Sequence, residues 1–344
     1  MERLEVEREA PPSAPAPPGG APEIVGRTPW QLFWRRFRKD RWALGGGAAV
    51  IVVVVLAVVG APIAERLTGH ELDETYIYSM TDEFGQPRGP TLSAELVPPE
   101  DQQGGSVFVF GADGLGRDVL VRILYGARTS LVVAVFATAI EIAIGIVLGL
   151  ISGYYRGKID TVISRITDVV LTLPVLLLAI GVGFACGSTK EGCVGGLVRP
   201  GIVLVSLIIG LFSWPYLSRI IRGQVLSLRE KEFTEAARSL GASNRRIVFR
   251  EILPNVIAPI IVYTTLIIPT NILFEAGLTF LGVGVPPEIP SWGRMLDEAS
   301  ENFDTQWWLM VFPGIFLFVT TLGFNLFGDG LRDALDPRSD RSTQ

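Results

Sequence analysis

Two carboxylates, Glu141 and Glu275, interrupt long apolar runs and are the first residues to consider for chemistry. An ionisable side chain inside a membrane is costly, so it usually meets a partner group or a water-filled pathway. A carboxylate in such a pathway could receive the amino terminus of a peptide. A hydrogen bond between helices would explain the acids at least as well, and Glu275 is close enough to the end of its run to be interfacial. With Asn271, these acids are our candidate residues for a translocation pathway.

Motifs for other kinds of chemistry are missing. No GxxxxGK[ST] phosphate loop occurs, since the nearest string, GYYRGKI from Gly153, has the wrong spacing. The GADGLG run from Gly111 lacks the strand–turn–helix context of a dinucleotide site and predicts a turn. The only histidine, His70, is expected to lie at the surface, which leaves no histidine triad or HExxH metal site. The sequence therefore predicts no catalytic residue, no metal site and no cofactor in this chain.

The two cysteines, Cys186 and Cys193, flank a hydrophilic turn. If this turn faces an oxidising compartment, the two thiols can form a disulfide. Two unpaired thiols are the alternative, and the spacing does not decide between them.

A polar, basic stretch from Ser227 to Asn255 separates two apolar runs and predicts a helical hairpin. Four side chains recur at helical spacing and share one face of its first helix. Gly241 is expected to end that helix, because glycine favours the left-handed position after a helix. Ser243 is expected to cap a second helix that ends at Pro254. The shared face consists of Phe233, Ala236, Ala237 and Leu240.

The composition predicts a multispan membrane protein, since 49% of the 344 residues are hydrophobic and the mean hydropathy is +0.41. A membrane-spanning helix needs about 20 apolar residues. Six runs meet this criterion, at residues 42–64, 129–155, 168–188, 200–218, 252–285 and 305–328. The sequence thus predicts an all-α polytopic protein with six transmembrane helices.

These runs divide the chain into segments with different expected roles. Before the first span, Thr28 and Pro29 start a helix with aromatic side chains on one face and basic ones on the other, typical of an interfacial helix. The segments are a disordered tail (1–27), the interfacial amphipathic helix (28–41), the first transmembrane helix (42–64), an extracytoplasmic segment (65–127), a core domain with five transmembrane helices and the hairpin 227–254 (128–328), and a second tail (329–344).

Three glycines in the second span, Gly145, Gly149 and Gly153, form a tandem GxxxG motif. Small residues at this spacing let another helix backbone approach closely. The partner helix can belong to the same chain or to another subunit, and the sequence leaves both open.

The loop charges predict the orientation. With the N-terminus in the cytoplasm, the cytoplasmic segments hold 22 of the 30 Lys and Arg residues and the outer segments hold 8. Both termini and the hairpin are then cytoplasmic, and the cysteines lie outside. The formal net charge of −5 argues against a nucleic-acid partner.

The string EAARSLG followed by ILPN resembles the EAA loop of ABC-type importer permeases. Glu251 stands where that pattern has isoleucine. Further strings resemble the dipeptide/oligopeptide permease group, C-type subunit, and together cover residues 110–338. They are GADGLGRDVLVRILYGARTSL from Gly111, GYYRGKID from Gly153, EAGLTFLGVGVPPEIPSWGRML from Glu275 and NLFGDGLRDALDPR from Asn325.

This resemblance implies a type I importer permease fold in the cytoplasmic membrane of a bacterium or archaeon. It implies a heterodimer with a B-type permease, two cytoplasmic ATPase subunits that bind ATP and Mg, and an extracytoplasmic peptide-binding protein. The chain would pass di- or oligopeptides inward. The residues implied in coupling to the ATPase are Glu235, Ala236, Ala237, Arg238, Gly241, Ala242, Leu253 and Pro254.

Three alternatives stay open at this point. The same machinery can carry nickel or another small solute. A stand-alone secondary transporter or channel could use Glu141 as an ion site. A structural membrane protein could use the hairpin only to recruit a cytoplasmic partner.

Overall fold

The computed structural model describes residues 29–76, 87, 89–90, 108–187, 201–301 and 303–335. Within these ranges the secondary structure is helical and contains no β-strand. The predicted tail 1–27, much of the predicted extracytoplasmic segment and Cys193 lie outside them. The predicted all-α fold is confirmed for the described part of the chain.

The first membrane helix is continuous from Arg41 to Thr68, although it contains one wider turn. Asp40 caps it, accepting hydrogen bonds from the backbone N–H groups of Trp42 (2.9 Å) and Ala43 (3.1 Å). Gly69 ends it in the left-handed conformation, with φ of 73°. Its parts are α2 (Arg41–Val55), the π-helical turn η1 (Leu56–Gly60) and α3 (Ala61–Thr68).

The helix before it, α1 (Pro29–Phe37), begins at the predicted proline. Only half of its aromatic face is available to a membrane. Phe33 and Phe37 are buried against the C-terminal helix, while Trp30 and Trp34 stay exposed. The interfacial assignment therefore remains a prediction, and only the two tryptophans can serve it.

The second span, α5 (Val119–Tyr155), starts earlier than its hydropathy predicts. Asp118 caps α5 by accepting hydrogen bonds from the N–H groups of Leu120 (2.8 Å) and Val121 (3.4 Å). The prediction missed this first part of the helix because Arg122 and Arg128 interrupt the apolar run.

The third and fourth predicted spans are each two helices joined at a bend. The third bends by 82° between α6 and α7, and the fourth by 41° between α8 and α9. Each bend coincides with a proline, Pro174 or Pro215, which cannot donate a backbone hydrogen bond. The four helices are α6 (Gly157–Thr172), α7 (Val175–Gly187), α8 (Ile202–Ser213) and α9 (Pro215–Arg229).

The C-terminal half contains the hairpin and two long spans. Between those spans lies α13 (Trp292–Ala299), which the sequence did not predict. The last span continues to Leu335, beyond the predicted limit at Gly328. The remaining elements are α10 (Glu232–Ser239), α11 (Asn244–Arg246), the π-helical turn η4 (Ile247–Ile252), α12 (Leu253–Phe280) and α14 (Trp307–Leu335).

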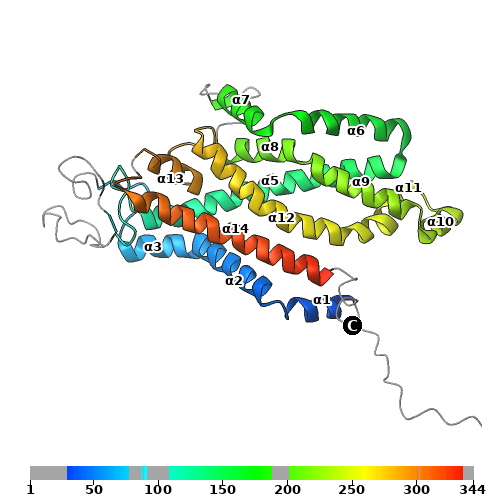
Figure 1. The fold of residues 1–344 in the computed structure, drawn as a ribbon, viewed down its shortest axis with the longest axis horizontal. Coiled ribbons are helices and arrows are strands. Elements are labelled where there is room, and N and C mark those ends of the chain that lie inside the picture. The colour runs from blue at the N-terminus through cyan, green and yellow to red at the C-terminus, as the bar shows by residue number, and fades with distance from the viewer. Residues whose placement is uncertain are drawn as a thin grey trace, which may run out of the picture.

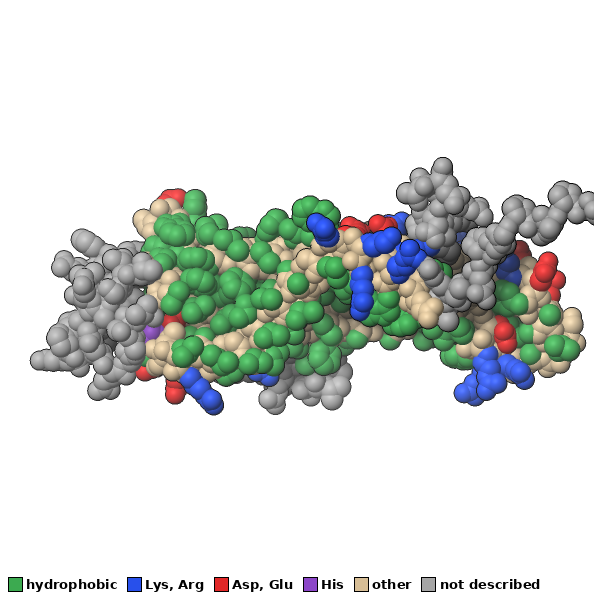
Figure 2. Space-filling view, turned by 90° about the horizontal axis from the view of Figure 1, so that it is seen from below, with side chains coloured by type: hydrophobic (Ala, Val, Ile, Leu, Met, Phe, Trp, Pro, Cys, Tyr) green, Lys and Arg blue, Asp and Glu red, His purple; other side chains and the backbone are tan. Residues whose placement is uncertain are grey.

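The long helices lie roughly along one axis and form an elongated bundle (Figure 1). One end carries α10 and α1 and is called the hairpin end; the opposite end carries α3 and α13. Among the described helices, four can each cross a membrane by length and composition, and the two bent pairs bring the number to as many as six. Hydrophobic side chains cover much of the face in Figure 2, and many of its Lys and Arg side chains gather toward the hairpin end.

The GxxxG glycines allow α5 and α9 to touch within this chain. A Cβ atom added to Gly149 would lie 2.7 Å from Ile221 Cβ, and one added to Gly153 would lie 2.7 Å from Val225 Cβ. Distances this short are incompatible with any larger side chain. The intramolecular alternative therefore accounts for the motif.

Candidate functional site

The hairpin has the predicted helix–glycine–helix geometry. α10 ends at Ser239, and Gly241 follows with φ of 79°, in the left-handed region. The N–H of Ala242 donates to Ala237 O at 3.0 Å, which closes the turn. The hydroxyl of Ser243 accepts a hydrogen bond from Arg246 N at 3.4 Å and caps the second helix.

Hydrogen bonds and apolar contacts fix the base of the hairpin to the bundle. Thr234 is fully buried, and its hydroxyl donates to Leu228 O at 2.8 Å. On the second helix, Asn244 Oδ1 accepts a hydrogen bond from the Tyr154 hydroxyl at 2.8 Å. Arg229 donates to Tyr154 O at 2.6 Å and lies over its ring. The hairpin is thus held by the ends of α5 and α9.

The tip presents the predicted face outward. Leu240 is 88% exposed and Phe233 is 39% exposed, although both are large apolar residues. Ala236 between them is also exposed, whereas Ala237 lies partly buried against the apolar cluster at the base. Exposed apolar side chains beside small residues are typical of a docking surface for another protein. Of the other predicted coupling residues, Glu235 and Arg238 are exposed, and Ala242 is partly buried.

The prediction that the second helix ends at Pro254 is wrong. The helix runs without interruption from Asn244 to Phe280. The wider π-helical turn η4 directly precedes α12, and Pro254 occupies one of the first positions of α12. A π-helical turn shifts the hydrogen-bonding pattern, so the missing N–H of proline does not break the helix. Leu253 is partly buried and Pro254 is exposed. The uninterrupted helix connects the hairpin directly to a long membrane helix.

Two of the three candidate pathway residues lie together. Glu141 on α5 and Asn271 on α12 are each 3% exposed, and Asn271 Nδ2 donates to Glu141 Oε2 at 3.2 Å. The same amide donates to Thr138 Oγ1 at 2.9 Å. Glu275 lies one helical turn after Asn271 on α12 and is fully buried, accepting a hydrogen bond from Thr279 Oγ1 at 2.9 Å. It is therefore not an exposed interfacial residue.

A cavity of about 530 Å³ lies beside Glu141 and Asn271. Its walls come from α5, both bent helix pairs and α12. Glu275 does not line it.

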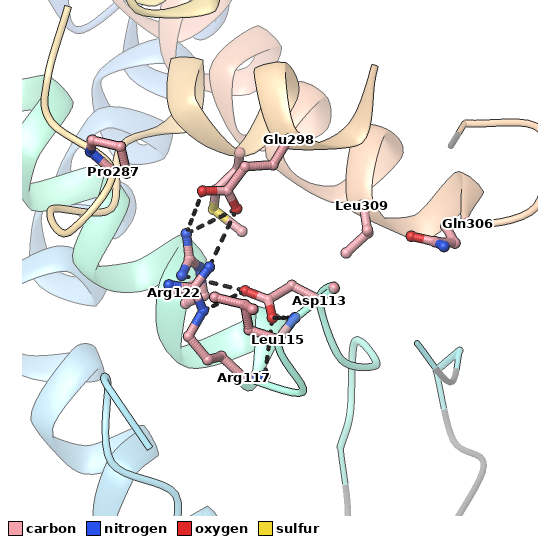
Figure 3. A pocket seen from close by; sticks show the side chains of 10 residues that line it. Asp113, Leu115, Arg117, Arg122, Pro287, Glu298, Gln306 and Leu309 are labelled. Carbon is pink, nitrogen blue, oxygen red and sulfur yellow. Dashed lines mark hydrogen bonds and ion pairs between the residues drawn. The ribbon is translucent and has the colours of Figure 1, made fainter. Parts of the chain in front are cut away.

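Sequence reasoning missed a charged cluster at the opposite end of the bundle (Figure 3). Arg122 is 3% exposed and contacts Asp113 at 3.2 Å and Glu298 at 3.0 Å. Arg117 contacts the same Asp113 at 2.7 Å. Burial raises the pKa of the Glu298 carboxyl. These side chains line a pocket of about 350 Å³ and tie α13 to the start of α5.

The structure also corrects the surface position predicted for His70. This residue is 1% exposed, with Nδ1 at 2.7 Å from Asp118 Oδ2, and its ring stacks on Phe108. Asp118 thus caps α5 and holds the end of the first membrane helix. The GADGLG run is a turn, as predicted, with Gly111 and Gly116 at positive φ.

The cysteine pairing stays a prediction. Cys186 is 2% exposed in an apolar cluster of α5, α7 and α8, but Cys193 lies outside the described residues. In the part of the chain that the structure describes, no group of three acidic, His or Cys side chains could hold a metal ion.

Two protein families match the sequence. Residues 145–341 match the family described as "Binding-protein-dependent transport system inner membrane component". Residues 28–82 match the "N-terminal TM domain of oligopeptide transport permease C".

Curated relatives match over most of the chain. The glutathione transport system permease protein GsiD of Shigella dysenteriae serotype 1 is 40% identical over 312 residues, which is 91% of each chain. The protein of the same name from Pectobacterium atrosepticum is 37% identical over 91% of this chain and 92% of its own.

Among solved structures, a chain of the MetNI methionine ABC transporter in inward-facing conformations gives a TM-score of 0.51 at 16% identity. The match covers 62% of this chain and 96% of that one. At this identity the match shows a shared fold, which is that of a type I ABC importer permease.

Proposed function

Because this chain belongs to the family of binding-protein-dependent transport system inner membrane components, as a C-type permease of the dipeptide/oligopeptide importer group, we propose that it passes di- or oligopeptides into the cell. It is a permease subunit of an ABC importer and not itself an ATPase. The GsiD relatives are named for glutathione, which is a tripeptide. A peptide-type substrate is therefore the class that the resemblance supports.

The single observation that carries the proposal is the exposed hairpin. Leu240 at its tip is 88% exposed, while its base is anchored by Thr234 and Asn244. A rigidly held apolar tip suits a groove on another protein. In our proposal this groove belongs to one of two ATPase subunits, which bind ATP and Mg. The proposed coupling residues are Glu235, Ala236, Ala237, Arg238, Gly241 and Ala242, with Leu253 and Pro254 at the start of α12.

The proposal includes an orientation and the remaining partners that the family resemblance implies. We propose that the hairpin end and both termini lie in the cytoplasm, which the excess of Lys and Arg in these loops supports. The opposite end, with α3 and α13, then faces the extracytoplasmic binding protein. A homologous B-type permease completes the membrane part as a heterodimer.

The proposed mechanism is alternating access driven by the ATPases. Closure of the two ATPase subunits moves the hairpin, and Gly241 keeps the turn that presents Ala236 and Leu240. Because the second hairpin helix continues into α12, a displacement of the hairpin is transmitted directly along that membrane helix. The bundle then opens outward to receive the peptide.

Mass spectrometry of the ligand that co-purifies with the associated binding protein tests the substrate class. We expect a population of short peptides. A nickel chelate or another non-peptide solute as the bound ligand would refute the peptide assignment. The chain should also purify together with ATPase subunits; transport by the chain alone would refute the ATP-driven mechanism.

A further inference from the structure

The cavity beside Glu141 lies where two membrane helices are interrupted. Leu173 and Val175 line it at the 82° bend between α6 and α7, and Ser213 and Tyr216 line it at the bend between α8 and α9. Figure 1 shows these bends within the length of the bundle and away from the hairpin. Interrupted helices in membranes occur where the backbone lines a cavity, and such places commonly bind a transported solute.

One oxygen of the Glu141 carboxylate can accept a hydrogen bond from a ligand. Asn271 Nδ2 donates to Oε2 at 3.2 Å, and no hydrogen bond among the described residues uses Oε1. Asn271 is held in turn by Thr138 at 2.9 Å, which fixes the amide and thereby the carboxylate. Glu141 is thus oriented by α12 and lines the cavity.

Four aromatic rings form part of the cavity wall, beside aliphatic side chains. Tyr216 and Tyr263 line it together with Phe212 and Phe274. A cation is attracted to the face of an aromatic ring as well as to a carboxylate. Tyr216 is 63% exposed, so the cavity has an accessible wall. No Lys or Arg lines the cavity, so among its lining residues the only formally charged group is the acid.

We propose that this cavity is a substrate subsite in which Glu141 Oε1 accepts a hydrogen bond from the primary ammonium group at the amino terminus of the transported peptide. The subsite rests on the proposed peptide function and adds to it a recognised chemical group. The aromatic walls take the adjoining side chain.

A purely structural role for Glu141 makes a different prediction. If the acid served only to hydrogen-bond Asn271, glutamine could replace it, and the amino terminus of the cargo would not matter. The experiment therefore compares two cargoes in one membrane. The complete importer is reconstituted in vesicles with its binding protein, and ATP-dependent uptake is measured for a tripeptide and for an N-acetylated analogue that the wild type carries at a measurable rate.

The quantity to compare is the ratio of uptake rates, free to acetylated. Preferences of the binding protein are the same for every variant and cancel when the ratios are compared. We expect Glu141→Gln to lower this ratio about tenfold or more, the size of effect for losing a charge-assisted hydrogen bond. Glu141→Asp keeps the charge and should retain the preference. The matched control, Glu65→Gln, changes an acid of α3 that accepts a hydrogen bond from the Tyr125 hydroxyl of α5 and lies outside the cavity, and it should leave the ratio at the wild-type value.

An unchanged ratio in Glu141→Gln would overturn the subsite. This holds whether both cargoes are carried at the wild-type rate or both rates fall by the same factor, since the acetylated peptide does not need the carboxylate. Failure of the wild type to take up either peptide is a separate outcome that refutes the proposed function.

Discussion

Replacing Gly241 with alanine isolates the backbone requirement of the hairpin turn. Gly241 has φ of 79°, and an added Cβ would meet no atom within 4 Å. The cost of alanine is therefore conformational and not steric. A left-handed conformation costs an L-residue about 1–2 kcal/mol, which corresponds to a shift of about 5- to 30-fold between the closed turn and competing conformations. We expect Gly241→Ala to shift the equilibrium of the turn toward competing conformations by this factor, and thereby to lower the fraction of hairpins able to engage the ATPase.

The assay is the number of peptides imported per ATP hydrolysed, in vesicles that contain the complete importer. Gly241→Ala should lower this coupling ratio, and Gly241→Asn should restore most of it because asparagine tolerates the left-handed region. Gly223→Ala is the matched control, since Gly223 lies in α9 with open space around it and helical backbone. Wild-type coupling in Gly241→Ala, or equal losses in the alanine and asparagine variants, would refute the backbone argument.

Two further predictions concern stability and are measured by thermal unfolding of the purified complex. Gly149→Ala places Cβ at 2.7 Å from Ile221 Cβ and should destabilise the α5–α9 contact by about 1–3 kcal/mol. The control Gly277→Ala, whose added Cβ meets no atom within 4 Å, should leave the stability unchanged. Equal unfolding midpoints for the two variants would contradict the packing argument. Arg122→Met removes one partner of the buried Asp113 carboxylate and should lower the free energy of unfolding by about 3 kcal/mol. Arg165→Met, at a side chain that is 80% exposed, should lower it by less than about 1 kcal/mol. Similar decreases in both variants would contradict the role of burial.

The hairpin was predictable because its signals are local. A stripe of four side chains, a glycine and a serine cap predict the end of α10 and the start of the next helix, and each of these signals matches the observed geometry. The end predicted at Pro254 was wrong because the neighbouring π-helical turn leaves no clear mark in a single sequence. Proline is not a reliable stop in this chain, since α12 also continues through Pro259 and Pro269.

Hydropathy found the membrane helices but not their ends. α5 begins at Val119 because Asp118 caps it. From the sequence alone, however, the charge of Arg122 predicts a polar loop, because its ion-pair partners are not known. One of these partners, Glu298, lies 176 positions from Arg122, and a pairing of this kind is not visible without the fold. His70 was misplaced for the same reason, since its partner Asp118 lies 48 positions away.

The pathway residues were predicted by type but not by arrangement. Acids in apolar runs single out both Glu141 and Glu275, but only the structure separates the one that lines a cavity from the one that is enclosed. The GxxxG motif likewise predicted a close helix contact and left its partner open, which the structure identifies as α9.

The most direct test of the account is ATP-dependent uptake of a labelled tripeptide by vesicles that contain this chain, its B-type partner, the ATPases and the binding protein. We predict uptake that requires ATP and the binding protein. We also predict that Leu240→Glu, which replaces the apolar side chain at the hairpin tip with a charged one, abolishes uptake. Peptide uptake that continues without ATPase subunits, or that is unaffected by Leu240→Glu, would contradict the central claim that the hairpin couples this permease to an ATP-driven motor.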